Sequence, residues 1–262
     1  MGLKSGDQRE HEDTCMLSFL LQTSLIGFRL LPIFVVTPIA SMQRVPITVR
    51  ILITLAIAMT LSKSYSADHQ ALLNGYALVF AFGGELLIGI SLAFSFHAAT
   101  AAMQTLGQLI DLQIGFSAGS VFDPNTEQTI SPTGELLTLM LLVSLVSFNV
   151  HHDLLIGFAK FLTILPPGSA VIWSENWLLI LGSQFTLGFI IVSPIILTLW
   201  FTDITLAFIS KSLPQAQVYF VGLPVKVMIG ILVLAWFSNQ AAEPLYRLLQ
   251  ASLNSWAMMF VP

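Results

Sequence analysis

Apolar segments long enough to cross a lipid bilayer recur along the sequence and restrict the folds open to it. A helix of about 20 apolar residues spans the hydrocarbon core of a bilayer. Segments of this kind cover about residues 16–37, 45–61, 71–96, 133–150, 177–201 and 218–237. They lack the alternation of membrane barrel strands. The sequence therefore predicts an all-α protein of membrane-associated helical hairpins, with shorter apolar helices at 154–165, 204–213 and 242–260.

Charged residues are scarce in this chain. Its 262 residues include ten Lys or Arg and fourteen Asp or Glu, whereas a soluble chain of this length carries roughly 65 charged side chains. So few charges cannot cover a soluble globule, and ten basic residues provide no patch for nucleic-acid phosphates. The single cysteine, Cys15, excludes an internal disulfide and a cysteine-based zinc site. We expect a membrane protein without nucleic acid, cofactor or metal.

The first 14 residues differ from the rest of the chain. They hold most of its closely spaced charges and too little apolar surface to fold alone: Lys4, Asp7, Arg9, Glu10, Glu12 and Asp13. We predict a polar mobile tail over residues 1–14 and a single hydrophobic helical domain over residues 15–262.

Lysine and arginine do not indicate a membrane orientation. In an arrangement of six spans, the loops on one side hold five of these residues and the loops on the other side hold four. Multi-span proteins usually show a clear excess on the cytoplasmic side. The near balance suggests that these helices do not all cross a bilayer in the ordinary way.

Four charged residues lie within or near the ends of apolar segments: Arg29, Glu85, Glu135 and Lys226. A charge at the centre of a membrane helix costs at least about 2.5–3.5 kcal/mol on insertion scales. We therefore expect these residues to have partners, in an ion path, a proton relay or an intersubunit salt bridge. Glu135 and Lys226 lie nearer to segment ends, where long side chains can also reach the interface. Arg29 and Glu85 lie deeper and could pair with each other.

A polar stripe follows the third apolar segment. Polar residues at spacings of three and four share one helical face: Thr100, Gln104, Gln108 and Asp111. Apolar residues occupy another face: Met103, Leu106, Ile110 and Ile114. Gln104, Gln108 and Asp111 are candidates for the lining of a wet path. An ordinary amphipathic helix is the alternative interpretation.

A short flexible segment with bulky apolar residues comes next. Small residues alternate there with phenylalanines before Asp123-Pro124 ends the segment. Hydrophobic constrictions close passages by excluding water, and glycine allows such a loop to move. We predict a plug or gate formed by Ile114, Gly115, Phe116, Ser117, Gly119 and Phe122. A membrane loop with two ordinary core phenylalanines is the alternative.

Motifs of enzymes are absent from the sequence. His151, His152 and Asp153 form a cluster of two histidines and an acid, and adjacent side chains on a helix point about 100° apart, which disfavours a shared metal. The sequence contains no P-loop, dinucleotide-binding glycine pattern, nucleophile elbow or zincin motif. We do not expect an enzyme.

Five motifs stand in a characteristic order. They are Arg29 with Pro38 and Val45-Pro46; Glu85-Leu-Leu-Ile-Gly89; Gln113-Ile-Gly115-Phe116 leading to Phe122-Asp123-Pro124; Phe148-Asn149-Val150-His151-His152; and Lys211-Ser-Leu-Pro214-Gln215 leading to Gly222-Leu223-Pro224. In order and spacing, over about residues 16–250, they resemble the FliR family of flagellar export-gate subunits, which has relatives in virulence injectisomes. Val150, Lys211 and Gln217 stand where that family usually has Gly, Arg and Asn.

The resemblance implies a function and an assembly. It implies one R subunit that completes a tapered helical ring with P and Q subunits, closed by the B export-switch protein. This gate would stand at the flagellar basal body in the bacterial inner membrane, project to the periplasmic side and pass unfolded flagellar proteins. The plug of the family maps onto residues 114–122. The Phe-Asp-Pro and Asn-x-His-His segments favour flagellar over virulence secretion.

Two other functions remain open from the sequence. One is a secondary transporter or another channel, with Arg29 and Glu85 as substrate or proton sites at broken helices. The other is a structural membrane scaffold.

Overall fold

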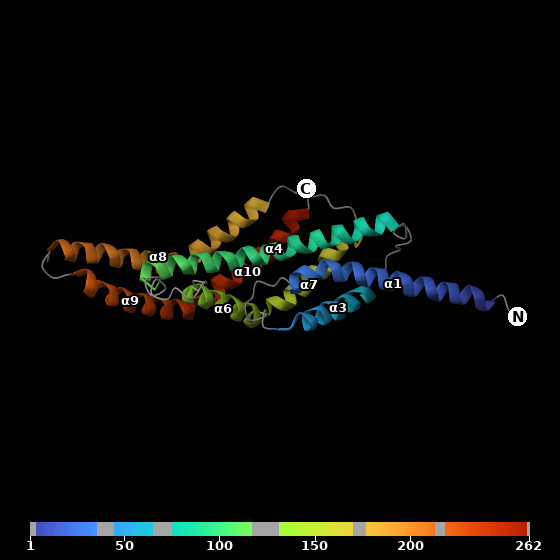
Figure 1. Ribbon diagram of the computed structural model, residues 1–262, viewed down its shortest axis with the longest axis horizontal. Coiled ribbons are helices and arrows are strands. Elements are labelled where there is room, and N and C mark those ends of the chain that lie inside the picture. The colour runs from blue at the N-terminus through green and yellow to red at the C-terminus, as the bar shows by residue number, and fades with distance from the viewer. Residues whose placement is uncertain are drawn as a thin grey trace, which may run out of the picture. The chain divides into compact units, whose positions relative to one another are not determined.

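The computed structural model describes residues 4–35, 45–64, 75–116, 131–169, 177–212 and 218–260, and Figure 1 shows it as ribbons. The regular structure in these ranges is helical throughout, which confirms the predicted all-α class. The helices are α1 (Lys4–Val35), α3 (Ile47–Ser64), α4 (Gly75–Ile114), α6 (Pro132–Ser147), α7 (Val150–Ile164), α8 (Trp177–Ser212), α9 (Val218–Gln240) and α10 (Ala242–Phe260).

Several predicted segments merge or shorten in the structure. The third apolar segment and the polar stripe form one helix, α4, of 40 residues, and α8 of 36 residues joins two further segments. Four of the described helices are long and apolar enough to cross a membrane, within α1, α4, α8 and α9. The bent pair α6 and α7, with 71° between its axes, provides a fifth if counted as one span. Six apolar segments thus yield four or five candidate spans.

The charged start of the chain is part of α1. This helix begins at Lys4 and continues without a break into the apolar residues that follow. The expected separate tail is therefore, over residues 4–14, the first part of a long helix. Lys, Gln, Arg and Glu favour helix even where they bury nothing. The predicted mobility of this segment stays a prediction.

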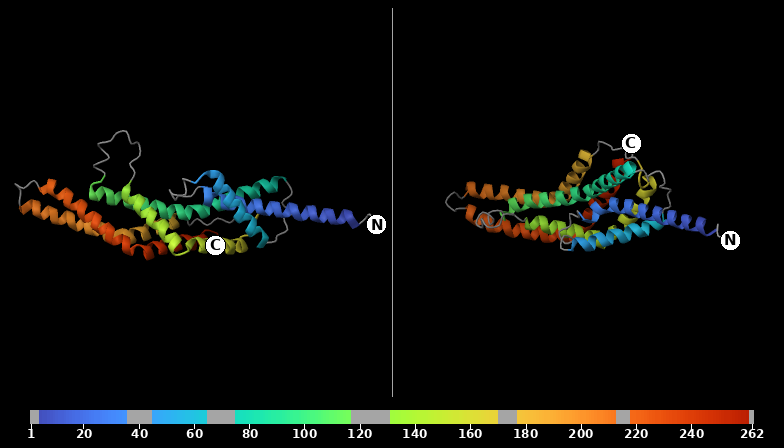
Figure 2. Two further views of the ribbon diagram at one scale, coloured as in Figure 1. Left: turned by 90° about the horizontal axis from the view of Figure 1, so that it is seen from below. Right: turned by 45° about the vertical axis from the view of Figure 1, so that its right-hand side comes forward.

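The chain divides into two compact units. Unit 1 comprises residues 1–97, 152–176 and 256–262, and unit 2 comprises residues 98–151 and 177–255. In unit 1, α3 packs along α1, where Gly27 faces Ala58. In unit 2, α8 and α9 form an antiparallel hairpin (Figure 2). Each unit therefore has helix contacts and a core of its own.

Buried leucine, isoleucine and alanine side chains form both cores. In unit 1 they include Leu25, Ile26, Leu30, Ile88 and Leu92. In unit 2 they include Met103, Leu106, Ile110, Leu137 and Leu199. Many large apolar side chains of α8 and α9 remain exposed instead: Trp200, Phe201, Phe208, Leu232 and Trp236. Such an exposed apolar surface indicates contact with lipid or with other proteins.

Candidate functional site

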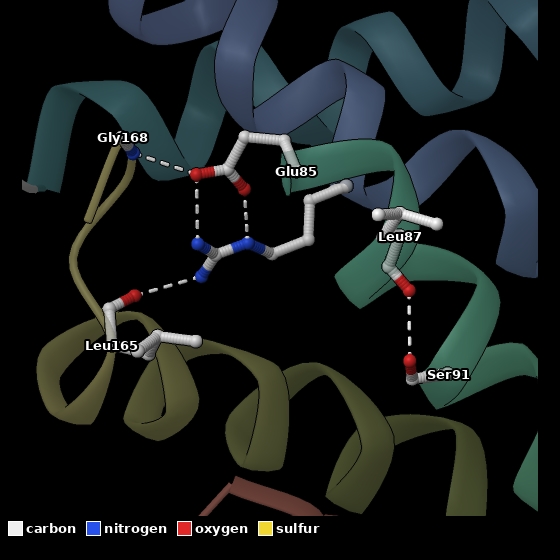
Figure 3. A network of polar contacts seen from close by, with 6 residues as sticks. Glu85, Leu87, Ser91, Leu165 and Gly168 are labelled. Carbon is white, nitrogen blue, oxygen red and sulfur yellow. Dashed lines mark hydrogen bonds and ion pairs between the residues drawn. The ribbon is translucent and has the colours of Figure 1, made fainter. Parts of the chain in front are cut away.

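A buried ion pair joins α1 and α4 in unit 1. Arg29 is 0% exposed and Glu85 is 1% exposed. The Nη2 of Arg29 donates a hydrogen bond of 2.9 Å to Glu85 Oε1, and its Nε donates to Glu85 Oε2 (Figure 3). Two parallel bonds between a guanidinium and a carboxylate give a strong pair of defined geometry. The structure thus brings together the two deepest charges that the sequence singles out.

Backbone groups after α7 complete this network. The Nη1 of Arg29 donates to the carbonyl oxygen of Leu165 at 2.8 Å, and the amide of Gly168 donates to Glu85 Oε1 at 2.6 Å (Figure 3). The guanidinium carbon of Arg29 also lies 5.6 Å from the ring centroid of Phe161, within the range of a cation–π contact. Both charges are therefore compensated by several groups, as a stable buried pair requires.

Local sequence explains why this backbone can bind both charges. Pro167 and Gly168 occupy the two central positions of a turn in which the amide of Ser169 donates to the carbonyl of Pro166 at 3.2 Å. Gly168 has φ +81°, which is the value for the third residue of a type II turn, and proline is common at the second. The amide of Gly168 is not used within such a turn, so it is free to bind Glu85.

The close approach of α1 and α4 depends on Gly89. A Cβ atom at this position would lie 2.2 Å from the carbonyl oxygen of Arg29 and 2.9 Å from the ring of Pro32. Gly89 lies one helical turn after Glu85 and therefore on the same face of α4. The Glu85-Leu-Leu-Ile-Gly89 motif thus provides the carboxylate for Arg29 and the space for the backbone that carries Arg29.

The polar stripe on the second half of α4 has two different parts. Gln104 and Gln108 are exposed, so they remain candidates for the lining of a passage. Asp111 is 5% exposed and binds the start of α6: it accepts hydrogen bonds from Ser131 Oγ at 2.5 Å, from the amide of Thr133 at 3.3 Å and from Thr133 Oγ1. The carboxylate of Asp111 therefore caps a helix N-terminus in this chain, and its predicted place in the lining of a passage stays a prediction.

Two glycines let α4 and α6 cross near this cap. A Cβ atom at Gly107 would lie 2.2 Å from the Cα of Gly134. A Cβ atom at Gly134 would lie 3.0 Å from the carbonyl oxygen of Gln104. Gly107 lies one helical turn before Asp111, so a glycine and a carboxylate again share one face of α4. Their combination fixes the start of α6 against α4.

The predicted plug begins at the end of α4. Ile114 is the last helical residue and is 0% exposed, and a Cβ atom at Gly230 of α9 would lie 2.7 Å from it. Ile114 is therefore a core residue of this chain, and its part in a plug stays a prediction. Gly115 has φ +95°, and the amides of Gly115 and Phe116 both donate to the carbonyl of Asp111 at 3.0 Å. These bonds close the helix in the usual C-terminal manner.

The remaining residues of that prediction lie outside the described residues. They are Ser117, Gly119 and Phe122, together with the motif residues Asp123 and Pro124. Phe116 is half-buried.

The two charges near segment ends have different environments. Glu135 is exposed in the first turn of α6, so it is not a buried charge in this chain, and its role in a subunit contact stays a prediction. Lys226 of α9 binds Asp203 of α8, with Nζ 2.8 Å from Oδ2 and 2.6 Å from Oδ1. The side chain of Lys226 is 14% exposed and that of Asp203 is 45% exposed. This pair fixes the α8–α9 hairpin.

The break between α6 and α7 explains the Asn-x-His-His motif in part. Asn149 has φ +55°, a left-handed conformation that asparagine tolerates better than most residues and that often ends helices. Phe148 stacks on Tyr246 with 4.7 Å between ring centroids. His151 and His152 are exposed. Asn149 therefore allows the bend between α6 and α7, and the two histidine side chains that follow it are exposed.

Comparison with known proteins identifies the family. A family model described as bacterial export proteins, family 1, matches residues 20–252. The chain belongs to this family. It is 27% identical to the flagellar biosynthetic protein FliR of Bacillus subtilis, over 80% of this chain and 83% of the relative, and 27% identical to FliR of Escherichia coli, over 79% and 80%. It is 25% identical to the Yop proteins translocation protein T of Yersinia pestis, over 86% and 90%.

Other motif positions of this export protein also lie at helix contacts. Pro46 precedes α3, and its carbonyl accepts from the amides of Val49 and Arg50. Gly222 is buried, and a Cβ atom there would lie 3.2 Å from Leu206 of α8, one turn before Lys226 binds Asp203. Pro224 lies inside α9. Pro214 and Gln215 lie outside the part of the chain that the structure describes.

Some residues of these contacts were missed by reasoning from the sequence. Arg50 donates to the carbonyls of Val35 and Val45 at 3.1 and 3.0 Å, and so binds the end of α1. Leu165 uses a backbone carbonyl, which no sequence pattern shows. Asp203 and Gly107 carried a detectable signal, since each is an unusual residue within an apolar helix. In this export protein, charges and glycines together mark where helices meet.

Proposed function

We propose that this chain is a subunit of a type III protein export gate of the flagellar kind, which passes unfolded flagellar proteins. The match of the family model over residues 20–252 carries the proposal. Relatives named for flagellar biosynthesis and a relative named for protein translocation resemble the chain over most of their length. A subunit of a protein export gate would account for both names. P, Q and B subunits of the gate are the partners in this proposal.

Helix lengths support a gate that extends beyond the membrane. At about 1.5 Å per residue, a helix of 40 residues is about 60 Å long, roughly twice the 30 Å hydrocarbon core of a bilayer. The helix α4 has this number of residues, and α8 has 36. We place the surplus on the periplasmic side of the bacterial inner membrane. The exposed apolar faces of α8 and α9 then meet other subunits as well as lipid.

Extraction in mild detergent tests the assembly. We expect the tagged chain to co-purify with the P, Q and B subunits, and to aggregate or be degraded when it is expressed without them, because its exposed apolar faces would be uncovered. Deleting its gene should abolish export of flagellar proteins. A monodisperse monomer, or a deletion strain that exports flagellar proteins and loses uptake of a small solute, would instead support the transporter.

The geometry of the ion pair does not favour the transporter. Arg29 and Glu85 are nearly inaccessible, and their bonds to each other, to Leu165 and to Gly168 leave no free site for a substrate or an ion. Residues that bind transported ions must exchange partners during each cycle. The pair is better suited to fixing helices in place.

We further propose that the segment from Gly115 to Phe122 is the plug of this gate. Its sequence combines bulky apolar and small flexible residues, a composition suited to a movable hydrophobic constriction. The two sides of the segment are anchored to each other, because Ser131 and Thr133 bind Asp111 of α4. Movement of the residues between these anchors would leave α4 and α6 in place.

Shortening the segment tests the plug. Deleting residues 116–122 retains Gly115, which closes α4, and leaves residues 123–130 to reach Ser131. We expect the complex to assemble and to conduct small ions in a lipid bilayer. Deleting the same number of residues from the first 14 is the control and should give a tight pore. An assembled complex of the plug deletion that does not conduct would contradict the assignment.

A further inference from the structure

One buried side chain of α8 has no hydrogen-bond partner within the described residues. Gln184 is 0% exposed, and neither its Nε2 nor its Oε1 is bonded to any of them. A glutamine side chain has two N–H donors and an oxygen that accepts two bonds. Most buried polar groups in proteins are paired, because an unpaired one loses its bonds to water without replacement. Gln184 therefore destabilises the packing in which it is found.

The position of Gln184 directs attention to the contact between α8 and α4 in unit 2. Gly188 lies one turn later on the same face of α8, and a Cβ atom there would lie 2.9 Å from Met103 Cε, 3.1 Å from Leu106 Cδ1 and 3.4 Å from Ala102 Cβ. The two helices run in the same direction (Figure 1). The turn of α4 that precedes Ala102 carries the buried residues Ala98 and Ala99. Gln184 thus lies on the face of α8 that packs against α4.

This contact can repack. Gly188 has no side chain, and the α4 atoms nearest to it are the ends of the flexible side chains of Met103 and Leu106; methionine in particular adapts to different packings. The described contact therefore combines a reason to move, the unpaired amide, with side chains that can rearrange.

We propose that α8 has two packings against α4 and that Gln184 destabilises the one seen in this structure. The proposal rests on the proposed function as an export gate. In the transporting gate, α8 turns or shifts so that the amide of Gln184 reaches water or a polar group of the passage. A ligand or substrate shifts such an equilibrium by its different affinity for the two states.

Replacing the amide with an apolar side chain of similar size tests the proposal in the assembled complex. Gln184→Met removes the unpaired groups, so we expect the resting complex to unfold at a higher temperature. The transporting packing becomes less populated, and we expect export of flagellar substrate to fall about tenfold. Gln184→Leu provides the same test if the methionine variant does not assemble. Gln240→Met, which makes the same change at an exposed position of α9, should alter neither quantity.

Each result has a defined meaning. A more stable complex with unchanged export overturns the two packings, because the amide would then be a mere defect of the core. A less stable complex overturns the premise, because the amide would then have a partner such as a bound water. If the proposed function itself were wrong, the wild-type complex would not export flagellar proteins at all. The thermal measurement would still decide whether Gln184 is unpaired.

Discussion

Replacing Glu85 with glutamine is expected to destabilise the chain by about 3–5 kcal/mol, because breaking a buried ion pair from one side leaves the other charge uncompensated. Glutamine has nearly the size of glutamate, so packing is preserved. The guanidinium of Arg29 would keep its bond to the carbonyl of Leu165 and lose its only carboxylate partner among the described residues. Thermal unfolding of the purified complex, or the yield of assembled complex, measures the loss.

A second ion pair of the chain supplies the control for this prediction. Glu243 and Arg247 of α10 pair across one helical turn and are 68% and 74% exposed. Exposed pairs of this kind contribute about 0.3–0.5 kcal/mol, so Glu243→Gln should have little effect. Replacing both Arg29 and Glu85 with methionine should recover much of the stability lost by Glu85→Gln, since a buried pair can often be replaced as a whole. If Glu85→Gln and Glu243→Gln behave alike, the buried pair has no structural role.

Gly89→Ala is expected to separate α1 from α4. The added Cβ atom would lie 2.2 Å from the backbone oxygen of Arg29, and a backbone atom cannot move aside as the end of a side chain can. Forcing extra atoms into a packed contact typically costs about 1–3 kcal/mol. The cost here should reach or exceed the upper end, because the separation also stretches the bonds between Arg29 and Glu85. Unfolding of the complex and its assembly yield measure the effect.

The same substitution six residues earlier in α4, Gly83→Ala, should not destabilise the protein. A Cβ atom at Gly83 would meet nothing within 4 Å, and alanine favours an exposed helix position by up to about 1 kcal/mol over glycine. Gly83→Ala is therefore expected to be neutral or stabilising. Equal effects of the two substitutions would show that α1 does not approach α4 at Gly89. Combining Gly89→Ala with Glu85→Gln should cost less than the sum of the two, since they damage one contact.

Hydrophobicity and charge made much of this fold predictable. Long apolar segments indicated helices, and the spacing of Met103, Leu106, Ile110 and Ile114 indicated the buried face of α4, where the structure places all of these residues in the core. The depth of Arg29 and Glu85 in apolar segments indicated that each needs a partner. Periodicity and burial cost are local properties of a sequence, so these inferences required no knowledge of the fold.

Other features depended on groups that a sequence does not display. The carbonyl of Leu165 and the amide of Gly168 bind the ion pair through the backbone, so their side chains give no sign of it. The partners of Asp111, Ser131 and Thr133, follow about 20 residues later, and only the fold brings them back to α4. The number of spans was overestimated because two predicted segments, those of α3 and α6, are not candidate spans by themselves, and α6 reaches the necessary length only together with α7, into which it bends.

The order in which the parts of the ion-pair network are synthesised has a consequence for the nascent chain. Arg29 is followed by Glu85 after 56 residues and by Leu165 after 136 residues. At about 5–20 residues per second, Glu85 emerges roughly 3–11 s and Leu165 roughly 7–27 s after the arginine. Until Glu85 emerges, an apolar helix carries an uncompensated guanidinium. Biogenesis of this subunit therefore requires a temporary host for Arg29, provided either by the insertion machinery or by a subunit made earlier.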